Sequence, residues 1–369
     1  METPVIMPDR AQLETFTAGT ETAVDVAQIE RQLHELWQLA AESEKDPSQR
    51  QITRDCLFNF IVLCETDAGA AHAGEVISSL TSHHPCRAIV LSAGLDSAPA
   101  ELSASISAHC HLAGTGQKQV CCEQIAIRAA GQSVAHLGSA VLPLLESDLP
   151  TIVWWQGNFL ERIDLFRRLV AAADRVIYDT SAWTQAPSQL AGLARVITEY
   201  PRCSFADLSW TRSGLWRRLA AEFFDEPQCR AELKRIRTVD ILHGGGPGAV
   251  VRALLYGSWF AAQLHWPVPE AKTRIHLSRR DDPEAASVGI LSVAIKTDRA
   301  TFSIRSNRGE NTASATVEMP HACGLPRKRA FWRSDDASLL SQELDHSVRD
   351  AVYEKSLAMT VALLEESSR

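Results

Sequence analysis

Two adjacent tryptophans at the end of a short apolar run constrain the fold of this chain more than any other segment. The run, residues 152–155 (IVWW), follows Leu-Pro at 149–150 and precedes Gln-Gly-Asn at 156–158. This pattern predicts a short buried strand that ends in a turn. Successive side chains on a strand point to opposite faces, so Trp154 and Trp155 cannot fill one core. We expect one ring to pack inside the first domain and the other to lie toward a second domain or an exposed cleft.

The first half of the chain alternates strand-like and helix-like segments. Residues 56–65 (CLFNFIVLCE) form an almost continuous apolar run, which is typical of a strand covered on both faces, so helices should flank it. The other predicted strands of this half are residues 87–92, 103–112, 119–130 and 175–178, and the predicted helices are residues 26–40, 71–80, 134–145, 160–173 and 190–200. This order predicts an α/β domain with a mixed sheet.

The second half carries a different pattern. An amphipathic helix follows Ser213, a plausible N-cap, and presents Leu215, Trp216 and Leu219 on one face. The later segments predict a strand at 239–242, a helix at 249–264, an antiparallel meander of strands at 273–278, 288–296, 300–305 and 313–318, and one or two closing helices within 337–365. This half therefore predicts an α+β domain with an antiparallel sheet and flanking helices.

Composition shifts mark the expected domain boundaries. Residues 1–24 lack apolar periodicity and predict a mobile leader. The polar break after Tyr200 separates an N-terminal α/β domain at 25–202 from a C-terminal α+β domain at 203–369.

The charge and cysteine content narrow the compartment and the partners. The formal net charge of -8 argues against a broad surface for nucleic acid or anionic lipid. No run of eighteen or more apolar residues occurs, and the N-terminus lacks the pattern of a signal peptide, so we expect a cytoplasmic protein that does not bind membranes. Nine cysteines without regular spacing fit reduced thiols better than a disulfide framework.

A glycine run at residues 244–248 (GGGPG) precedes a predicted helix, where backbone N–H groups could bind a phosphate. It lacks both the Lys-Ser/Thr of a P-loop and the GxGxxG spacing, so a flexible joint between strand and helix is the preferred interpretation. The alternative stays open: a sugar-phosphate-binding enzyme or sensor that uses the Gly244 to Gly248 turn as its anion site.

Histidines and cysteines gather in three early segments without a recognised metal-binding spacing. Ordinary buried cysteines are the preferred interpretation, so we predict no metal and no cofactor. The residues considered are His83, His84, Cys86, His109, Cys110, His111, Cys121 and Cys122. The chain also lacks GxSxG, SxxK and a cysteine beside a convincing base, and its carboxylates Glu75, Glu123, Asp148, Asp164 and Asp207 occur singly, so no catalytic residue is predicted.

Tryptophan is the more conspicuous residue type. The chain has nine, and several are accompanied by arginine, the pair of residue types most enriched at protein–protein hot spots. Core packing is the commoner fate of any single tryptophan. The candidate partner-binding or domain-interface residues are Trp154, Trp155, Trp210, Arg212, Trp216 and Arg217.

Several of these segments, in this order, resemble the glucose-6-phosphate dehydrogenase assembly proteins of the OpcA family. The matching stretches are HPCRAIV (84–90), CEQI (122–125), LL (144–145) with DLPT (148–151) and WW (154–155), DLSWTR (207–212) with WR (216–217), and ALLYGSW (253–259) with LHW (264–266). The resemblance implies a non-enzymatic protein that binds glucose-6-phosphate dehydrogenase, promotes its functional oligomer and raises its activity in the oxidative pentose phosphate pathway. The family has no established catalytic residues to transfer to this chain.

Overall fold

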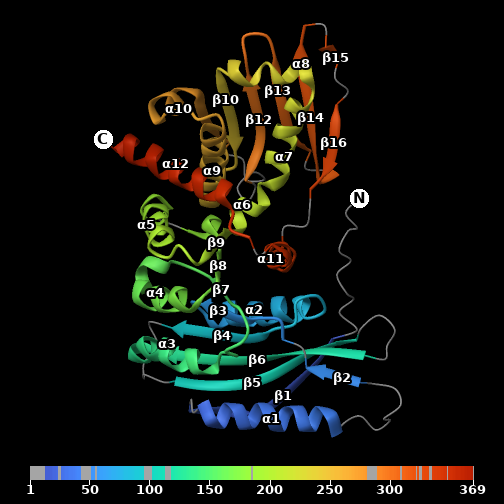
Figure 1. Ribbon diagram of the computed structural model, residues 1–369, viewed down its shortest axis with the longest axis vertical. Coiled ribbons are helices and arrows are strands. Elements are labelled where there is room, and N and C mark those ends of the chain that lie inside the picture. The colour runs from blue at the N-terminus through green and yellow to red at the C-terminus, as the bar shows by residue number, and fades with distance from the viewer. Residues whose placement is uncertain are drawn as a thin grey trace. The chain divides into compact units, whose positions relative to one another are not determined.

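The chain forms two compact units, each built around one sheet (Figure 1). The computed structural model describes residues 13–23, 26–42, 51–54, 56–94, 102–112, 118–183, 186–280, 289–307, 310–320, 322–323, 326–331, 335–346 and 348–368. Unit 1 comprises Met1–Tyr178, Tyr200–Phe205 and Asp336–Ser347, and unit 2 comprises Asp179–Glu199, Ala206–Asp335 and Val348–Arg369.

Unit 1 contains a nine-stranded mixed sheet with the order β1-β5-β6-β4-β3-β7-β8-β9, and β2 pairs with β6. The strands β6, β4, β3, β7 and β8 run parallel to one another, whereas β5 is antiparallel to both β1 and β6. The strands are β1 (Leu13–Ala23), β2 (Gln51–Arg54), β3 (Asn59–Cys64), β4 (Arg87–Gly94), β5 (Leu102–Leu112), β6 (Lys118–Ala130), β7 (Thr151–Trp155), β8 (Arg175–Tyr178) and β9 (Ser204–Asp207).

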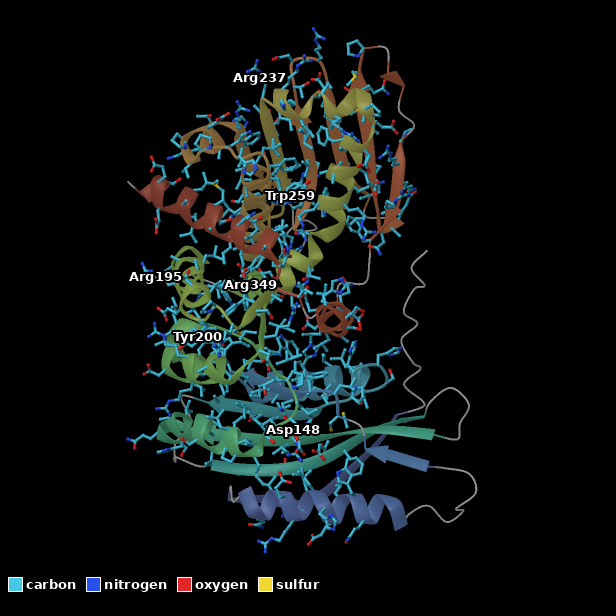
Figure 2. All side chains as sticks on the ribbon, in the orientation of Figure 1. Asp148, Arg195, Tyr200, Arg237, Trp259 and Arg349 are labelled. Carbon is cyan, nitrogen blue, oxygen red and sulfur yellow. The ribbon has the colours of Figure 1, made fainter. Side chains whose placement is uncertain are left out.

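The central strands are buried because helices cover them. All six residues of β3 are buried, as its continuous apolar run predicts. The helices of unit 1 are α1 (Val26–Glu42), α2 (Asp67–Leu80), η2 (Gly131–His136), α3 (Leu137–Val141), η3 (Leu142–Leu144), η4 (Phe159–Arg162), α4 (Ile163–Ala172) and α11 (Asp336–Asp345). In α4 the residues Leu165, Phe166, Leu169 and Val170 are buried at helical spacing. Asp148, labelled in Figure 2, lies in the turn just before β7.

The helix α11 comes from the C-terminal part of the sequence yet packs in unit 1. Its Ser341 Oγ lies 2.9 Å from the buried His84 Nε2, and its Asp336 Oδ2 lies 3.1 Å from His72 Nε2. Its Glu343 also forms an ion pair with Arg175. Because these partners lie more than 150 residues away, no local pattern in the sequence signals the contact.

Unit 2 contains a seven-stranded sheet with the order β11-β10-β12-β13-β14-β15, and β16 pairs with β14. Its strands are β10 (Thr238–His243), β11 (Ile275–Arg279), β12 (Ile290–Lys296), β13 (Thr301–Asn307), β14 (Thr312–Met319), β15 (Ala322–Cys323) and β16 (Arg327–Ala330). Its helices are η5 (Thr180–Ala182), α5 (Ala186–Glu199), α6 (Leu208–Arg212), α7 (Gly214–Glu222), η6 (Phe223–Asp225), α8 (Pro227–Arg230), η7 (Leu233–Arg235), α9 (Pro247–Gln263), α10 (Val268–Arg274) and α12 (Ala351–Ser368).

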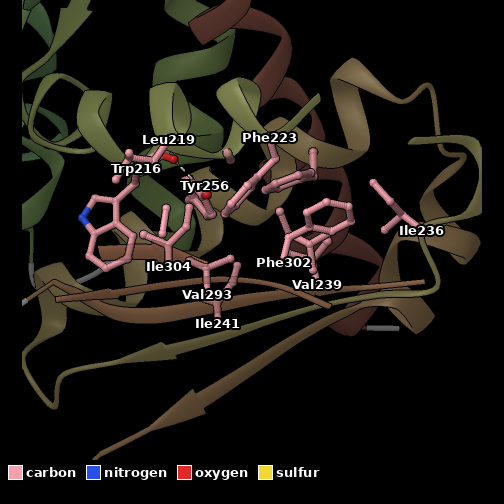
Figure 3. Packing of buried hydrophobic residues seen from close by; sticks show 14 of the residues in the cluster. Trp216, Leu219, Phe223, Ile236, Val239, Ile241, Tyr256, Val293, Phe302 and Ile304 are labelled. Carbon is pink, nitrogen blue, oxygen red and sulfur yellow. Dashed lines mark hydrogen bonds between the residues drawn. The ribbon is translucent and has the colours of Figure 1, made fainter. Parts of the chain in front are cut away.

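The core of unit 2 lies between this sheet and the helices α7 and α9 (Figure 3). Phe302 of β13 contacts both Phe223 and Phe224, with ring centroids 5.3 and 5.0 Å apart. Tyr256 of α9 is fully buried, and its hydroxyl donates a hydrogen bond to the carbonyl oxygen of Trp216 at 3.2 Å. The apolar face that the sequence predicts after Ser213 is therefore buried in this core.

The predicted fold class, an α/β half followed by an α+β half, is confirmed. The predicted antiparallel meander is wrong in its first strand, residues 273–278. Residues 275–279 pair with β10 in the parallel direction and not with β12, since α9 and α10 carry the chain back before β11 begins.

The predicted domain boundaries stay a prediction, and residues 1–12 of the predicted leader lie outside the described residues. Where the sequence predicts a mobile leader, Leu13–Ala23 forms β1, which pairs with β5. A strand with no apolar alternation of its own gains order from a distant partner, which a local pattern cannot show. The contact-based units are discontinuous, because α5 belongs to unit 2 and α11 to unit 1, so the single boundary after residue 202 stays a prediction.

Candidate functional site

The segment 207–212 (DLSWTR) folds around a buried carboxylate. Asp207 ends β9 and caps α6, where its side chain accepts a hydrogen bond from Ser209 N at 2.9 Å. It also accepts hydrogen bonds from Thr180 N at 3.0 Å and Thr180 Oγ1 at 2.6 Å. Burial, reinforced by the charge of Asp179, raises the pKa of Asp207 to about 7. This carboxyl therefore titrates near neutral pH.

Asp179 is a second carboxylate of the same region. It caps η5, where Oδ1 accepts hydrogen bonds from the backbone N and the hydroxyl of Ser181. Its other oxygen forms an ion pair with Arg212, the last residue of α6. Arg212, one of the predicted interface residues, thus has an internal partner, and its side chain is only 14% exposed.

Trp210 and Arg217 form a stacked pair within unit 2. The guanidinium carbon of Arg217 lies 3.4 Å from the centroid of the Trp210 ring, the geometry of a cation–π contact. Arg217 Nη1 also donates to the carbonyl oxygen of Trp210 at 2.7 Å. On its other side, Trp210 Nε1 donates to Asp350 Oδ2 at 2.8 Å, and the ring contacts Tyr353. The pair therefore connects α6 and α7 to the start of α12.

The rings of Trp210 and Trp216 are internal. Trp210 and Trp216 are each 4% exposed, and Trp216 packs against Phe331 with ring centroids 6.0 Å apart. The physical reason is the hydrophobic effect, because burying a large apolar ring in an adjacent core removes its surface from water. Whether Trp154, Trp155, Trp210, Arg212, Trp216 and Arg217 lie at a partner-binding or domain interface stays a prediction.

The two adjacent tryptophans of β7 point apart but are both buried. Trp154 stacks on Phe60 at 6.4 Å with an interplanar angle of 7°, whereas Trp155 meets the edge of Phe166 of α4 at 4.8 Å. The opposite orientation is confirmed. The prediction that one ring lies toward an exposed cleft is wrong, because each ring is only 2% exposed. Both faces of β7 are therefore covered.

The glycine run is a tightly fitted joint between β10 and α9. Gly248 approaches η5 so closely that a Cβ there would lie 2.4 Å from the carbonyl oxygen of Ser181. Gly244 N donates to Gly289 O at 2.9 Å. The close approach to Ser181, and not only flexibility, accounts for a glycine at position 248.

Sequence reasoning missed Arg252, which lies one and a half turns into α9. Burial and the neighbouring charge of Arg212 lower its pKa. One feature of the sequence points to Arg252: it is the single charged residue of the segment that forms α9 (PGAVVRALLYGSWFAAQ).

Among the early histidines and cysteines, the described side chains form internal contacts. Cys122 Sγ lies 2.9 Å from Thr81 Oγ1, and a hydrogen bond to Cys122 together with burial raises the pKa of Cys86. In the described part of the chain, no group of three or more His, Cys, Asp or Glu is placed to hold a metal ion. The side chains of His109, Cys110, His111 and Cys121 lie outside the described residues.

None of the helices described is both long enough and apolar enough to span a membrane.

Comparisons with known proteins find relatives along most of the chain. Residues 77–195 match the family described as "Glucose-6-phosphate dehydrogenase subunit N-terminal domain", and residues 203–357 match the corresponding "C-terminal domain". Proteins named "Putative OxPP cycle protein OpcA" from Synechocystis sp. and Nostoc punctiforme are each 28% identical, over 319 and 321 residues. These matches cover 79% and 78% of this chain and 66% of each relative, slightly less than two thirds of its length.

This chain also has distant likenesses among solved structures. The aldose-aldose oxidoreductase from Caulobacter crescentus matches with a TM-score of 0.43 and 12% identity, over 85% of this chain and 99% of that one. A likeness at that level does not bear on function.

Proposed function

Since the chain belongs to the OpcA family of glucose-6-phosphate dehydrogenase assembly proteins, we propose that it is a non-catalytic partner of that dehydrogenase, promotes its active oligomer and raises its rate. The observation that carries the proposal is the pair of matches to the N-terminal and C-terminal domains described for a dehydrogenase subunit, which occur in that order along the chain. We further propose that it acts in the cytoplasm, in the oxidative pentose phosphate pathway.

The internal role of the family-like segments supports a rigid binding partner. In the segment 207–212, Asp207 caps a helix, Trp210 binds Asp350, and Arg212 binds Asp179. These contacts fix α6 against η5 and α12, so the surface that unit 2 presents is formed before a partner arrives. A preorganised surface loses less conformational entropy on binding than a loose one.

Activation requires a difference in affinity between two states of the partner. A protein that binds the active oligomer tenfold more tightly than the inactive form shifts that equilibrium by about 1.4 kcal/mol. A protein with equal affinity for both forms shifts nothing. The proposal therefore demands both complex formation and a change in the oligomer distribution.

The test is a titration of the purified chain into glucose-6-phosphate dehydrogenase from the same organism. NADPH formation is followed by absorbance, and oligomer mass by size-exclusion chromatography with light scattering. We expect a saturable increase in rate, co-elution and a shift toward the larger oligomer. Serum albumin at equal mass concentration serves as the control for crowding.

The outcomes separate the candidate roles. Co-elution without a change in rate would identify a passive scaffold, and the activating role would be wrong. If the dehydrogenase neither co-elutes with the chain nor changes its rate, the partner itself is misassigned. Turnover of glucose 6-phosphate by the isolated chain would contradict the non-catalytic role.

A further inference from the structure

The joint between β10 and α9 has the backbone arrangement of an anion site. The strands β10 and β11 are parallel neighbours with α9 and α10 between them in the sequence, which makes a β-α-β unit. The glycine run lies at the carboxyl end of β10, the edge at which parallel strands commonly bind ligands. The 17-residue helix α9 begins there, and its N-cap, Gly246, provides no side-chain hydrogen bond to the first turn. Pro247 has no N–H and Ala249 N donates to Gly246 O at 3.0 Å, so the backbone N–H groups of Gly245, Gly246 and Gly248 are those with which this end of the helix favours an anion.

A part-buried arginine with a buried, unpartnered Nε atom provides the second observation. Arg252 Nε is inaccessible to solvent, and no hydrogen bond joins it to any other described residue. The side chain reaches the glycine run, because a Cβ at Gly289 would lie 2.2 Å from Arg252 Nη1, and Gly289 O accepts the hydrogen bond of Gly244 N. A helical side chain leans toward the N-terminus of its helix, which agrees with this placement.

The acidic groups near Arg252 are already occupied. Asp179 binds Arg212 and caps η5. Asp207 accepts hydrogen bonds from Thr180 and Ser209 and titrates near neutral pH, so much of it is uncharged there. Both carboxylates therefore have partners of their own, whereas the buried Nε of Arg252 has no acceptor among the described residues, which is costly. A bound anion would supply a countercharge and the missing hydrogen-bond acceptor.

We propose that Gly245 and Gly246, the first turn of α9 and Arg252 bind a phosphate group, either free phosphate or the phosphomonoester of a small metabolite. Arg252 supplies the fork of donors for the phosphate oxygens, in the place of the lysine that the glycine run lacks. The site belongs to this chain alone and does not depend on the dehydrogenase, so it goes beyond the function proposed above.

The test uses the full chain and four ligands at matched ionic strength: sodium phosphate, glucose 6-phosphate, glucose and sodium chloride. Binding is measured by isothermal titration calorimetry and by the thermal midpoint. We expect phosphate or glucose 6-phosphate to bind and to raise the midpoint, whereas glucose and chloride do neither. Arg252→Met should weaken binding by about tenfold or more, because a charge-assisted pair is lost.

The matched control is Arg237→Met. Arg237, labelled in Figure 2, lies next to the opposite end of β10 and forms an exposed ion pair with Asp298. The control removes the same charge from unit 2 without touching the glycine run, so it should bind phosphate like the wild type. Equal weakening in both variants would show a general effect of charge and would overturn the site.

The free protein adds an independent readout. A buried Nε without an acceptor destabilises the fold, so Arg252→Met without ligand should melt at or above the midpoint of the wild type. A clearly lower midpoint would show that Arg252 has a structural partner, which contradicts the proposal. In the wild type, phosphate should shift the amide resonances of Gly245 and Gly246. Unchanged resonances at saturating phosphate, or no binding of either phosphate compound, would equally overturn it.

Discussion

Glu123→Gln in the buried ion cluster of unit 1 is the most informative single substitution. Glu123 is fully buried, with one carboxylate oxygen bound to Arg87 Nε and the other accepting a hydrogen bond from Trp37 Nε1 at 3.0 Å. Arg87 is 3% exposed and also binds Glu30, Glu146 and the carbonyl oxygen of Leu144. Glutamine keeps the shape of the side chain but removes the charge that balances a buried guanidinium.

The expected loss follows from this geometry. Removing one partner of a buried pair costs about 3–5 kcal/mol, because the other charge is left without compensation. Two carboxylates remain on Arg87, and both are partly exposed, at 46% and 42%, so they compensate only in part. We therefore expect the variant to lose about 3 kcal/mol, the lower end of that range. For a unit of this size, the loss corresponds to a midpoint about 6–12 °C lower.

Urea unfolding followed by tryptophan fluorescence measures the loss directly, since Trp37, Trp154 and Trp155 all lie in unit 1. The control is Glu35→Gln, which removes the same charge from an exposed position of α1 and should change the free energy of unfolding by less than about 0.5 kcal/mol. A loss below about 1 kcal/mol in Glu123→Gln would refute the reasoning, because it would show that Arg87 does not need this carboxylate.

Three further predictions test other parts of the structure. The folded-state pKa of Asp207 is raised from 3.8 to about 7, so its contribution to stability is present at low pH and is lost as pH rises through about 7, by up to about 4 kcal/mol; urea titrations between pH 4 and pH 8 should show this fall in the wild type but not in Asp207→Asn. Gly248→Ala should lower the free energy of unfolding by about 1–3 kcal/mol through its clash with the η5 backbone. Gly74→Ala in α2, where an added Cβ would only touch the Gln124 side chain at 3.6 Å, should be neutral or stabilising by up to about 1 kcal/mol in the same urea assay. Burial raises the pKa of Cys64 to about 12, so alkylation followed by mass spectrometry should modify the half-exposed Cys56 first in the native protein, and equal rates would contradict this order.

The elements with strong local patterns were predictable from the sequence. The continuous apolar run at 56–65 predicts a doubly covered strand, and the apolar face after Ser213 predicts a helix buried in a core. In both cases the residues that define the element are neighbours along the chain, so the spacing of their apolar side chains indicates which faces are buried. The opposite orientation of Trp154 and Trp155 follows in the same way from the two-residue period of a strand.

The candidate site was predictable only in part. The segment 207–212 stands out in the sequence, but its roles depend on Asp179, Thr180 and Asp350, which lie far from it along the chain. The isolated charge of Arg252 within its apolar helix is visible in the sequence. The absence of a hydrogen bond from its Nε to any described residue could not be predicted, because burial and pairing are properties of the folded packing.

Local patterns were enough to predict the order and type of most elements, an α/β half followed by an α+β half, and the resemblance to a family, since each of these rests on local periodicity or on short segments. Tertiary structure alone decided that both rings of the Trp154-Trp155 pair are buried, that α11 returns to unit 1, and that β11 pairs with β10. Those outcomes depend on which distant surface covers a given face, and the free energy gained there comes from contacts between segments that no local pattern contains.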